Sequence, residues 1–499
     1  MDAYVIERGL IVRDDGSACL GLGQPSLAVS WPRHAIGSSG SDQLDWRAVT
    51  TGADDTEVEI ELEALDLRAS LRHTVTGDRW RVRATLRNAG LAPVSVSGAS
   101  VDVSAGLGQA WVWGGGAAAA VVLAAGPDAS RPWALSLRRG ELTDEGGELR
   151  WLSSGETLAP GQRVVLELDG VACPDWGAAA WNALPSWLPT TALREGEGLE
   201  LALPDAAVQA PECEVTEDEA VTTVSGTGRR RVVVSGSFGR VSLDADFAPS
   251  LTAAVRATSR QLARLVREVP GAVLQADGTG PDDRARALDR AARRLLVLQA
   301  AREHGAEQDI VRGWLLEGVT HLVVTGGVVG ASTVAALAGE VQRRGDVQAQ
   351  TALLEAVAHL DAAPGMGLVL TRAWVALWGA GVDVAPVRTA LEAVLASPDD
   401  SDLARIERQL LQRDGTTEAD LLGRWQGMLG AGLPGRGLPA VDPVGMARLV
   451  ATSSLITDAG ASGAANDVVT AAETVALRLL AGHGDDPDVL SWLVLAQRD

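Results

Sequence analysis

The sequence predicts a protein whose first half is β and whose second half is α, with the change near Pro249. Before that residue, apolar side chains alternate with polar ones, as in the run from Glu57 to Leu62. This alternation is typical of strands with one face in the core. After it, apolar residues recur every third or fourth position, as in the run from Leu288 to Leu296, which is typical of amphipathic helices. The predicted fold class is therefore multidomain, with an antiparallel β sandwich followed by a helical domain.

The composition limits the classes of function. The 499 residues are enough for two or three domains, and the formal net charge of −22 argues against nucleic acid or an anionic membrane as a partner. The chain contains no lysine, which excludes Schiff-base catalysis. Its three cysteines are widely separated and none forms a Cys-x-x-Cys pair, which favours reduced thiols over a disulfide framework or a zinc site. We expect no metal and no cofactor.

Two segments bear on localisation. The first seven residues lead into a strand pattern and lack the basic start and apolar core of a signal peptide. The uncharged stretch 321–339 is interrupted by three glycines, so it predicts a buried helix-turn-helix and not a membrane span. We therefore expect a cytoplasmic protein with no membrane partner.

The β half is predicted to contain two units. Many short strands of similar length predict an antiparallel sandwich over residues 1–172. Residues 173–249 are predicted to form a connection rich in Trp and Pro and then a small β subdomain, or alternatively a second lobe of the same sandwich. Turn residues such as Asp14-Asp15-Gly16 separate the strands. The strands are expected at roughly 3–13, 26–30, 56–62, 65–73, 79–88, 93–103, 118–124, 133–138, 148–152, 163–169, 199–203, 220–224, 231–235 and 241–247.

The α half, residues 250–499, is predicted to contain about twelve helices joined by short connections marked by Gly, Pro or Asp. Such connections place successive helices antiparallel, so the helices can form either a closed double ring of six hairpins or an open solenoid. No sequence repeat is visible, which favours the closed ring, an (α/α)6-like toroid. The helices are expected near 251–268, 282–304, 308–325, 330–344, 348–361, 367–380, 385–396, 401–413, 417–429, 443–457, 462–481 and 486–497.

The segment from Leu265 to Ala276, with its Gly271-Ala272 pair, resembles the first helix and the following loop of the six-hairpin glycosidases, especially bacterial glucoamylases. The predicted order of a β sandwich and a helical toroid is also similar to theirs. The resemblance implies a glycoside hydrolase-like protein that acts on an oligosaccharide or glycoconjugate. However, the aromatic sugar-binding stretch that the family has after this loop is missing, since residues 281–286 run into a helix without an aromatic residue. No catalytic residue is therefore carried over, and the protein is either a divergent or a catalytically lapsed relative.

Glycoside hydrolysis needs two carboxyl groups on either side of the scissile bond. Asp277, Asp361 and the pair Asp485 and Asp486 fall in loops after the first, fifth and eleventh predicted helices, which would open on one face of the ring. Asp361, Asp485 and Asp486 are the candidate catalytic residues. The competing interpretation is that they are helix caps or solvated charges.

Tryptophans supply the candidate substrate-binding residues, because their faces pack against sugar rings. Trp111 and Trp113 alternate on a predicted strand, and Trp374 and Trp378 lie one turn apart on a predicted helix. With only one Tyr and two Phe in the chain, these tryptophans also serve the core. The alternative function is a non-enzymatic scaffold whose helices bind a protein partner. A deep pocket with two carboxylates and a Trp would favour the enzyme.

Overall fold

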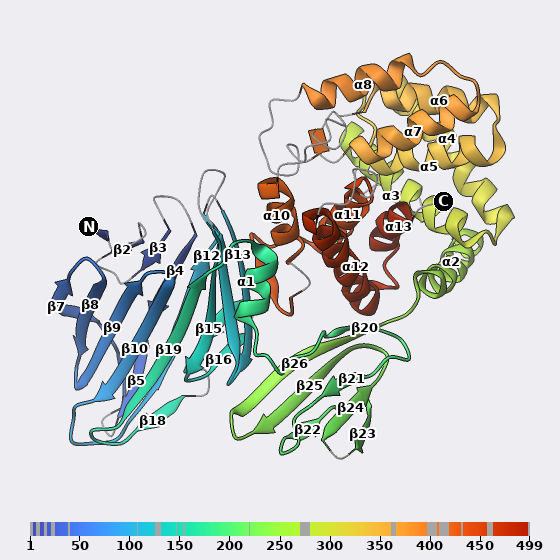
Figure 1. Cartoon of the computed structure of the whole chain (residues 1–499). Helices are drawn as coiled ribbons and strands as arrows, with labels where there is room; N and C mark the ends of the chain where they lie inside the picture. The colour runs from blue at the N-terminus through green and yellow to red at the C-terminus, as the bar shows by residue number, and fades with distance from the viewer. Residues whose placement is uncertain are drawn as a thin grey trace.

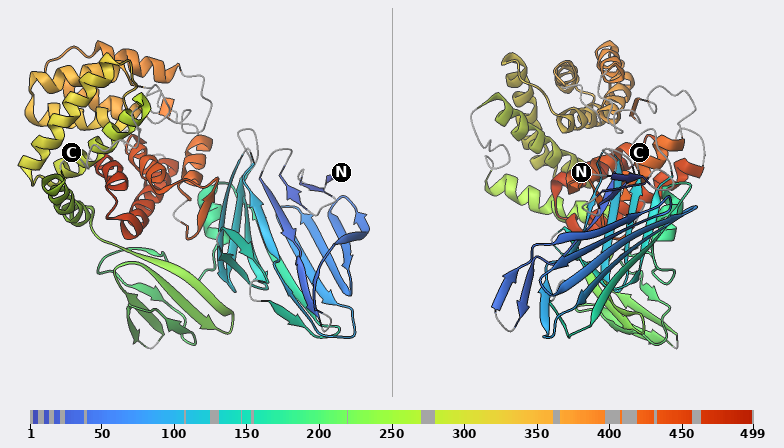
Figure 2. Two further views of the ribbon diagram at one scale, coloured as in Figure 1. Left: turned by 180° about the vertical axis from the view of Figure 1, so that it is seen from behind. Right: turned by 90° about the vertical axis from the view of Figure 1, so that its left-hand side faces the viewer.

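The structure is a computed structural model, which Figures 1 and 2 show from three sides. It describes residues 3–497 apart from the segments 6–9, 14–16, 21–24, 38–39, 107, 125–130, 146, 153–154, 219, 270–279, 361–365, 397–406, 409–418, 431–432 and 457–462.

Strands fill most of the chain up to residue 248, and one more strand follows far later. They are β1 (Ala3–Val5), β2 (Ile11–Arg13), β3 (Ala18–Cys19), β4 (Ser26–Ser30), β5 (His34–Gly37), β6 (Gly40–Gln43), β7 (Arg47–Ala53), β8 (Glu57–Ala64), β9 (Leu67–Thr76), β10 (Arg79–Asn88), β11 (Val94–Ser97), β12 (Ser100–Ser104), β13 (Gln109–Gly116), β14 (Ala119–Ala124), β15 (Trp133–Arg139), β16 (Leu142–Glu145), β17 (Glu148–Arg150), β18 (Glu156–Leu158), β19 (Arg163–Ala172), β20 (Ala192–Arg194), β21 (Leu199–Leu201), β22 (Ala207–Gln209), β23 (Glu214–Asp218), β24 (Val221–Ser225), β25 (Gly228–Gly236), β26 (Gly239–Ala248) and β27 (Arg436–Leu438).

Among the described residues, helices other than α1 follow residue 250. They are α1 (Trp176–Ala183), α2 (Leu251–Glu268), α3 (Pro281–Ala301), α4 (Gly305–Val324), α5 (Ala331–Arg344), α6 (Val347–Ala358), α7 (Gly367–Gly379), α8 (Ala385–Leu395), α10 (Ala419–Met428), α11 (Pro443–Ser453), α12 (Gly463–His483) and α13 (Pro487–Ala496). The predicted order of β before α is therefore confirmed.

The strands form one large network of twenty within the described chain, together with a four-stranded sheet (β5, β6, β11, β18) and a three-stranded sheet (β21, β23, β24). The longest hairpin, β9–β10, pairs in register from Leu67 with Asn88 to Thr76 with Arg79. Its inward positions alternate strictly, because every second side chain of a strand faces the same side. The pairings are antiparallel except for β20 beside β26.

Strand β13 joins the parts of this network. Its residues 109–114 pair with β14, while Gly115 and Gly116 pair with β16 and Gly116 also with Val241 of β26. Three consecutive glycines make this possible, since a Cβ on Gly114 would lie 2.6 Å from the backbone nitrogen of Asp144. On its other edge β13 pairs with β27, a strand that comes from the helical half of the sequence.

The prediction of a separate β sandwich followed by a twelve-helix toroid is therefore wrong. The large sheet takes strands from all three predicted segments, including β25 and β26 from 173–249 and β27 from 250–499. Helix α12 packs on β20, β25 and β26, and α10 packs on α1 and β13. The alternation of apolar residues identifies the faces of a strand, but it does not determine which strands pair, and that is why the separate sandwich was predicted.

Alternate helices pack against one another: α3 contacts α5 and α13, α5 contacts α7, and α11 contacts α7 and α13. In Figure 1 the helices gather on one side of the molecule, with α12 next to the sheet formed by β20 and β26. Part of the predicted helix pair 401–413 and 417–429 lies outside the described residues.

Three apolar clusters hold the molecule together. One lies within the helices, one within the N-terminal strands, and one between the sheet, α1 and the hairpin β25–β26. Strand β13 contributes to two of them, because Ala110 and Val112 face the strand cluster while Trp111 and Trp113 face the third. This third cluster includes Trp113 and Leu243, which also line a cavity between the hairpin β25–β26 and α12.

Candidate functional site

The hairpin β25–β26 carries alternating charges on one face. Its register places Arg229 opposite Asp246 and Arg231 opposite Asp244. The other face is apolar apart from Arg230, and residues such as Val232 and Leu243 are buried in the third cluster. Directly opposed charges of unlike sign stabilise an antiparallel pair, so the sequence of the hairpin itself fixes this array.

Asp246 is the buried member of the array. Its side chain is 5% exposed, and its Oδ1 lies 2.7 Å from Nε of Arg229. Nε of Arg478, from α12, lies 3.9 Å from Oδ2. Burial raises the pKa of Asp246, although Arg229 and then Arg478 act in the opposite direction.

Arg478 closes the site from the helical side. It donates to the carbonyl of Leu433 and, at 3.4 Å, to Oγ1 of Thr191. Burial lowers the pKa of Arg478 to about 10, so the guanidinium is protonated at neutral pH. A carboxyl and a guanidinium with opposite pKa shifts in one cleft are typical of functional sites, although structural ion pairs also show them.

Asp244 lies two residues from Asp246 on the same face of β26, and it is exposed. Its side chain makes no hydrogen bond or ion pair with another described residue, although Arg231 is its cross-strand neighbour. Nε of Arg231 instead donates to Oγ of Ser242 at 2.6 Å. The two carboxyl groups therefore differ in surroundings, one buried beside arginines and the other open to solvent.

Together these residues line a cavity of about 310 Å³ between the hairpin, α12 and β27, here called the hairpin cavity. Trp113 and Asp144 complete one wall, and Nε of Arg436 from β27 lies 3.1 Å from Oδ2 of Asp144. A neighbouring cavity of about 240 Å³ shares Arg229, Arg436 and Arg478 and extends to Trp111 and His483. The volume of the hairpin cavity falls at the lower end of the range of small-ligand sites.

The two strand tryptophans that the sequence singled out thus lie beside these cavities. Trp111 is 1% exposed and Trp113 is 5% exposed, and both belong to the third apolar cluster. They share one face of β13, as the alternation predicts.

Of the other predicted carboxylates, the structure describes Asp485 and Asp486. Asp277 and Asp361 fall outside the described residues. Asp486 is the N-cap of α13 and accepts from the backbone of Asp488 at 2.8 Å, while Asp485 is exposed. The structure does not bring Asp485 or Asp486 into the hairpin cavity.

Trp374 and Trp378 both belong to α7. Trp374 is partly buried with Arg388 over its ring at 5.7 Å, whereas Trp378 is 70% exposed. Neither lines the hairpin cavity.

The sequence patterns did not single out Arg229, Asp244, Asp246, Arg436 or Arg478 as site residues. One sequence pattern could have identified the hairpin residues. Asp244 and Asp246 are two residues apart, as are Arg229 and Arg231 on the preceding strand, so each pair shares a face. Arg436 and Arg478 had no such signal, since they reach the site only through tertiary packing of β27 and α12.

Neither a metal centre nor a membrane span is found in the described part of the chain. No group of three or more His, Cys, Asp or Glu side chains among those residues is placed to hold a metal ion. None of the helices described is both long and apolar enough to cross a bilayer.

Comparisons with known proteins relate the chain to carbohydrate-active enzymes through structure alone. No protein-family model matches the sequence, and no curated protein matches it. A solved polysaccharide lyase shares the fold with a TM-score of 0.55 and 12% identity, over 89% of this chain and 75% of the lyase. This likeness extends through both halves and so includes the order of β before α.

Two further matches are weaker. A GH36 α-galactosidase from Geobacillus stearothermophilus matches 31% of this chain and 33% of its own, with 14% identity and a TM-score of 0.23. A family 81 glycoside hydrolase from Clostridium thermocellum matches with 10% identity and a TM-score of 0.18, over 95% of this chain and 67% of its own. Of these three structures, the lyase has a TM-score above 0.5, and the other two carry no argument about the fold of this chain.

Proposed function

We propose that this chain is a glycoside hydrolase-like, carbohydrate-active protein that binds an oligosaccharide or glycoconjugate in the hairpin cavity. The observation that carries the proposal is the pair Asp244 and Asp246, which line one cavity with Trp113 and differ in burial. The shared fold with a polysaccharide lyase supports the carbohydrate class. Fold alone does not determine chemistry, so the activity is argued from these residues.

The two carboxyl groups suit an acid and base pair. The backbone positions of residues two apart on a strand are about 6.6–6.8 Å apart. Inverting glycosidases hold their two carboxyl groups about 6.5–9.5 Å apart, so side chains that leave this strand in parallel would suit that mechanism. Burial raises the pKa of Asp246, which favours its protonated form, so it is the proposed general acid. The exposed Asp244 is the proposed base that activates water. Arg229 and Arg231 would donate to sugar hydroxyl oxygens.

The tryptophans Trp111 and Trp113 are proposed to shape the apolar wall of the site. Trp113 lines the hairpin cavity itself, and Trp111 lines the neighbouring one. Asp361, Asp485 and Asp486 stay as alternative proposed catalytic residues, and Trp374 and Trp378 stay as proposed substrate-binding residues.

The test is a hydrolysis screen of the purified chain against α- and β-linked oligosaccharides, with released reducing sugar as the readout. We expect cleavage of one linkage and, by NMR of the first product, inversion at the anomeric carbon. Binding without cleavage would support a catalytically lapsed relative. The absence of both binding and cleavage across the whole panel would contradict the carbohydrate proposal.

A protein-binding scaffold is the second candidate function. It is favoured by two large apolar side chains in solvent, Trp181 on α1 at 84% exposure and Trp378 at 70%. Tryptophan is enriched among residues that contribute most to protein interfaces. The two candidates differ in the face they use, because neither tryptophan lines the hairpin cavity.

A further inference from the structure

A larger cavity lies within the helical half and shares no lining residue with the hairpin cavity. Its volume is about 870 Å³, and it is bounded by the C-terminal parts of α3, α5 and α13, the start of α4 and the middle of α7. Arg302, Arg343, Arg344 and Arg372 line it, together with glutamines such as Gln299 and Gln308. None of its lining residues is Asp or Glu, in a chain whose net charge is −22. We call it the arginine cavity.

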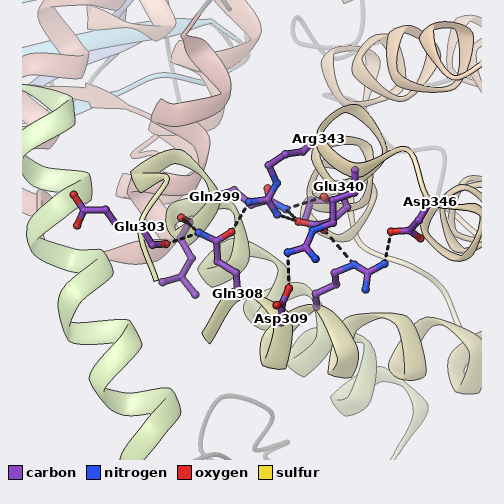
Figure 3. Close-up of polar contacts among 11 residues, drawn as sticks. Gln299, Glu303, Gln308, Asp309, Glu340, Arg343 and Asp346 are labelled. Carbon is purple, nitrogen blue, oxygen red and sulfur yellow. Dashed lines mark hydrogen bonds and ion pairs between the residues drawn. The ribbon is translucent and has the colours of Figure 1, made fainter. Parts of the chain in front are cut away.

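A buried carboxylate lies behind these arginines. Glu340 of α5 is 0% exposed, and its carboxylate meets the guanidinium groups of Arg343, Arg344 and, from α4, Arg312. Nε of Arg344 lies 3.1 Å from Oε2 of Glu340, and Nε2 of Gln299 donates to Oε1 at 2.7 Å. Figure 3 shows Glu340 at the centre of this network, with Arg343 and Gln299 beside it. Asp309 and Asp346 bind two of the same three guanidinium groups, so three carboxylates balance three arginines in this network. The positive charge that is not balanced at the cavity therefore comes from Arg302 and Arg372, which also line it.

Further contacts hold the arginines and glutamines in fixed positions. Arg343 also donates to Gln308, whose amide donates to the carbonyl of Leu298 at 2.8 Å. Asp309 binds Arg344, and Asp346 binds Arg312. Figure 3 shows Asp346 on the side of the network away from Gln299, and Asp309 below the network. A preorganised guanidinium loses less freedom when it binds a ligand.

Two more arginines complete the positive wall. Arg372 of α7 donates to the carbonyls of Leu495 and Gln497, at 2.8 and 3.0 Å, and so spans from α7 to the end of α13. Arg302 follows the last residue of α3 and is exposed. Its side chain makes no hydrogen bond or ion pair with any described residue, which leaves it available to a ligand.

We propose that the arginine cavity binds a sugar that carries an anionic group, either a carboxylate or a phosphate. The planar guanidinium fork matches both groups, and the neutral amides of the glutamines match hydroxyl groups. The volume lies within the range of small-molecule sites. The inference does not rest on hydrolysis in the hairpin cavity, because the two sites have separate residues.

The test is isothermal titration calorimetry of the full chain at low ionic strength with three probes: trigalacturonate, glucose 6-phosphate and neutral maltotriose. We expect one anionic probe to bind and maltotriose to bind at least tenfold more weakly, with the bound probe identifying the anionic group. Arg302→Gln removes one guanidinium and is expected to weaken that binding about tenfold, the effect of one charged hydrogen bond. Higher salt should weaken it as well, because an exposed ion pair is screened.

Arg260→Gln is the matched control, since Arg260 is an exposed arginine of α2 outside the cavity lining. It changes the charge equally and should bind as the unaltered protein does. Circular dichroism checks that both variants fold. The proposal is overturned if neither anionic probe binds at millimolar concentration, if maltotriose binds equally well, or if R302Q binds as R260Q does. Asp244→Asn should leave this binding unchanged, which separates the outcome from that of the proposed hydrolysis.

Discussion

Arg229 lies directly opposite Asp246 on paired strands, and its Nε is 2.7 Å from Oδ1 of that carboxylate. The pair faces α12, and Nε of Arg478 on that helix lies 3.9 Å from Oδ2 of the same carboxylate. A buried carboxyl between two guanidinium groups has two opposing influences on its charge. Burial favours the neutral form and the arginines favour the ionised form, and burial has the larger effect because the pKa of Asp246 is raised.

The raised pKa gives a prediction about stability and pH. A carboxyl whose pKa is higher in the folded than in the unfolded protein stabilises the fold at a pH below its unfolded pKa. That contribution is lost as the pH rises through the folded pKa. We therefore expect Asp246→Asn to match the unaltered protein near pH 3 and to become the more stable of the two as the pH rises above about 4. Urea unfolding of both proteins from pH 3 to 8 measures the difference.

The opposite sign would mean that the ion pairs outweigh burial. Removing one partner of a buried pair is destabilising in proteins where the Coulombic attraction dominates. A lower stability of D246N at pH 7 would therefore contradict the direction of the pKa shift. It would also remove Asp246 as the proposed general acid.

Asp244→Asn tests the proposed base. Because Asp244 is exposed and its side chain makes no hydrogen bond or ion pair with a described residue, the free energy of unfolding should change by less than about 0.5 kcal/mol. Any glycosidase activity should fall by at least about a hundredfold, the lower range for loss of general base catalysis. Asp218→Asn, on the exposed strand β23, is the control and should retain full activity. If Asp361→Asn or Asp485→Asn abolishes activity and D244N does not, the catalytic site lies on the helices.

Trp111→Ala tests the role of the buried strand tryptophan. With 1% exposure, the side chain packs within the third cluster, and its loss should cost about 3–5 kcal/mol of stability. Urea unfolding measures that cost. If instead stability is nearly unchanged while glycan binding is lost, Trp111 is a sugar platform and not a core residue.

Gly435→Ala tests the attachment of β27 to the sheet. Gly435 has φ +104°, and a Cβ there would lie 2.2 Å from the carbonyl oxygen of Val112. We expect a loss of stability of about 1–3 kcal/mol and weaker binding in the hairpin cavity, which Gly435 and Arg436 line. Gly437→Ala is the matched control, because a Cβ at Gly437 meets nothing within 4 Å. Equal stability of the two variants would show that β27 does not hold the site together.

Trp378→Ala tests the scaffold alternative. The side chain is 70% exposed, so its removal should change stability by less than about 0.5 kcal/mol. If the helices bind a protein partner through α7, that interaction should weaken, and oligosaccharide binding should stay the same. Loss of oligosaccharide binding instead would place a glycan on the helices.

The sequence by itself determined the order of β before α, the faces of the strands and the shared face of Trp111 and Trp113. These depend on local periodicity, which burial of one face imposes on every strand and helix. It also contained the alternating charges of Arg229, Arg231, Asp244 and Asp246, because strand neighbours two apart share a face. Only the tertiary structure decided that β27 pairs with β13 and that the sheet takes strands from every predicted segment. Arg436 and Arg478 come from elements about 200 residues away from the hairpin, and no local pattern specifies such a long-range contact.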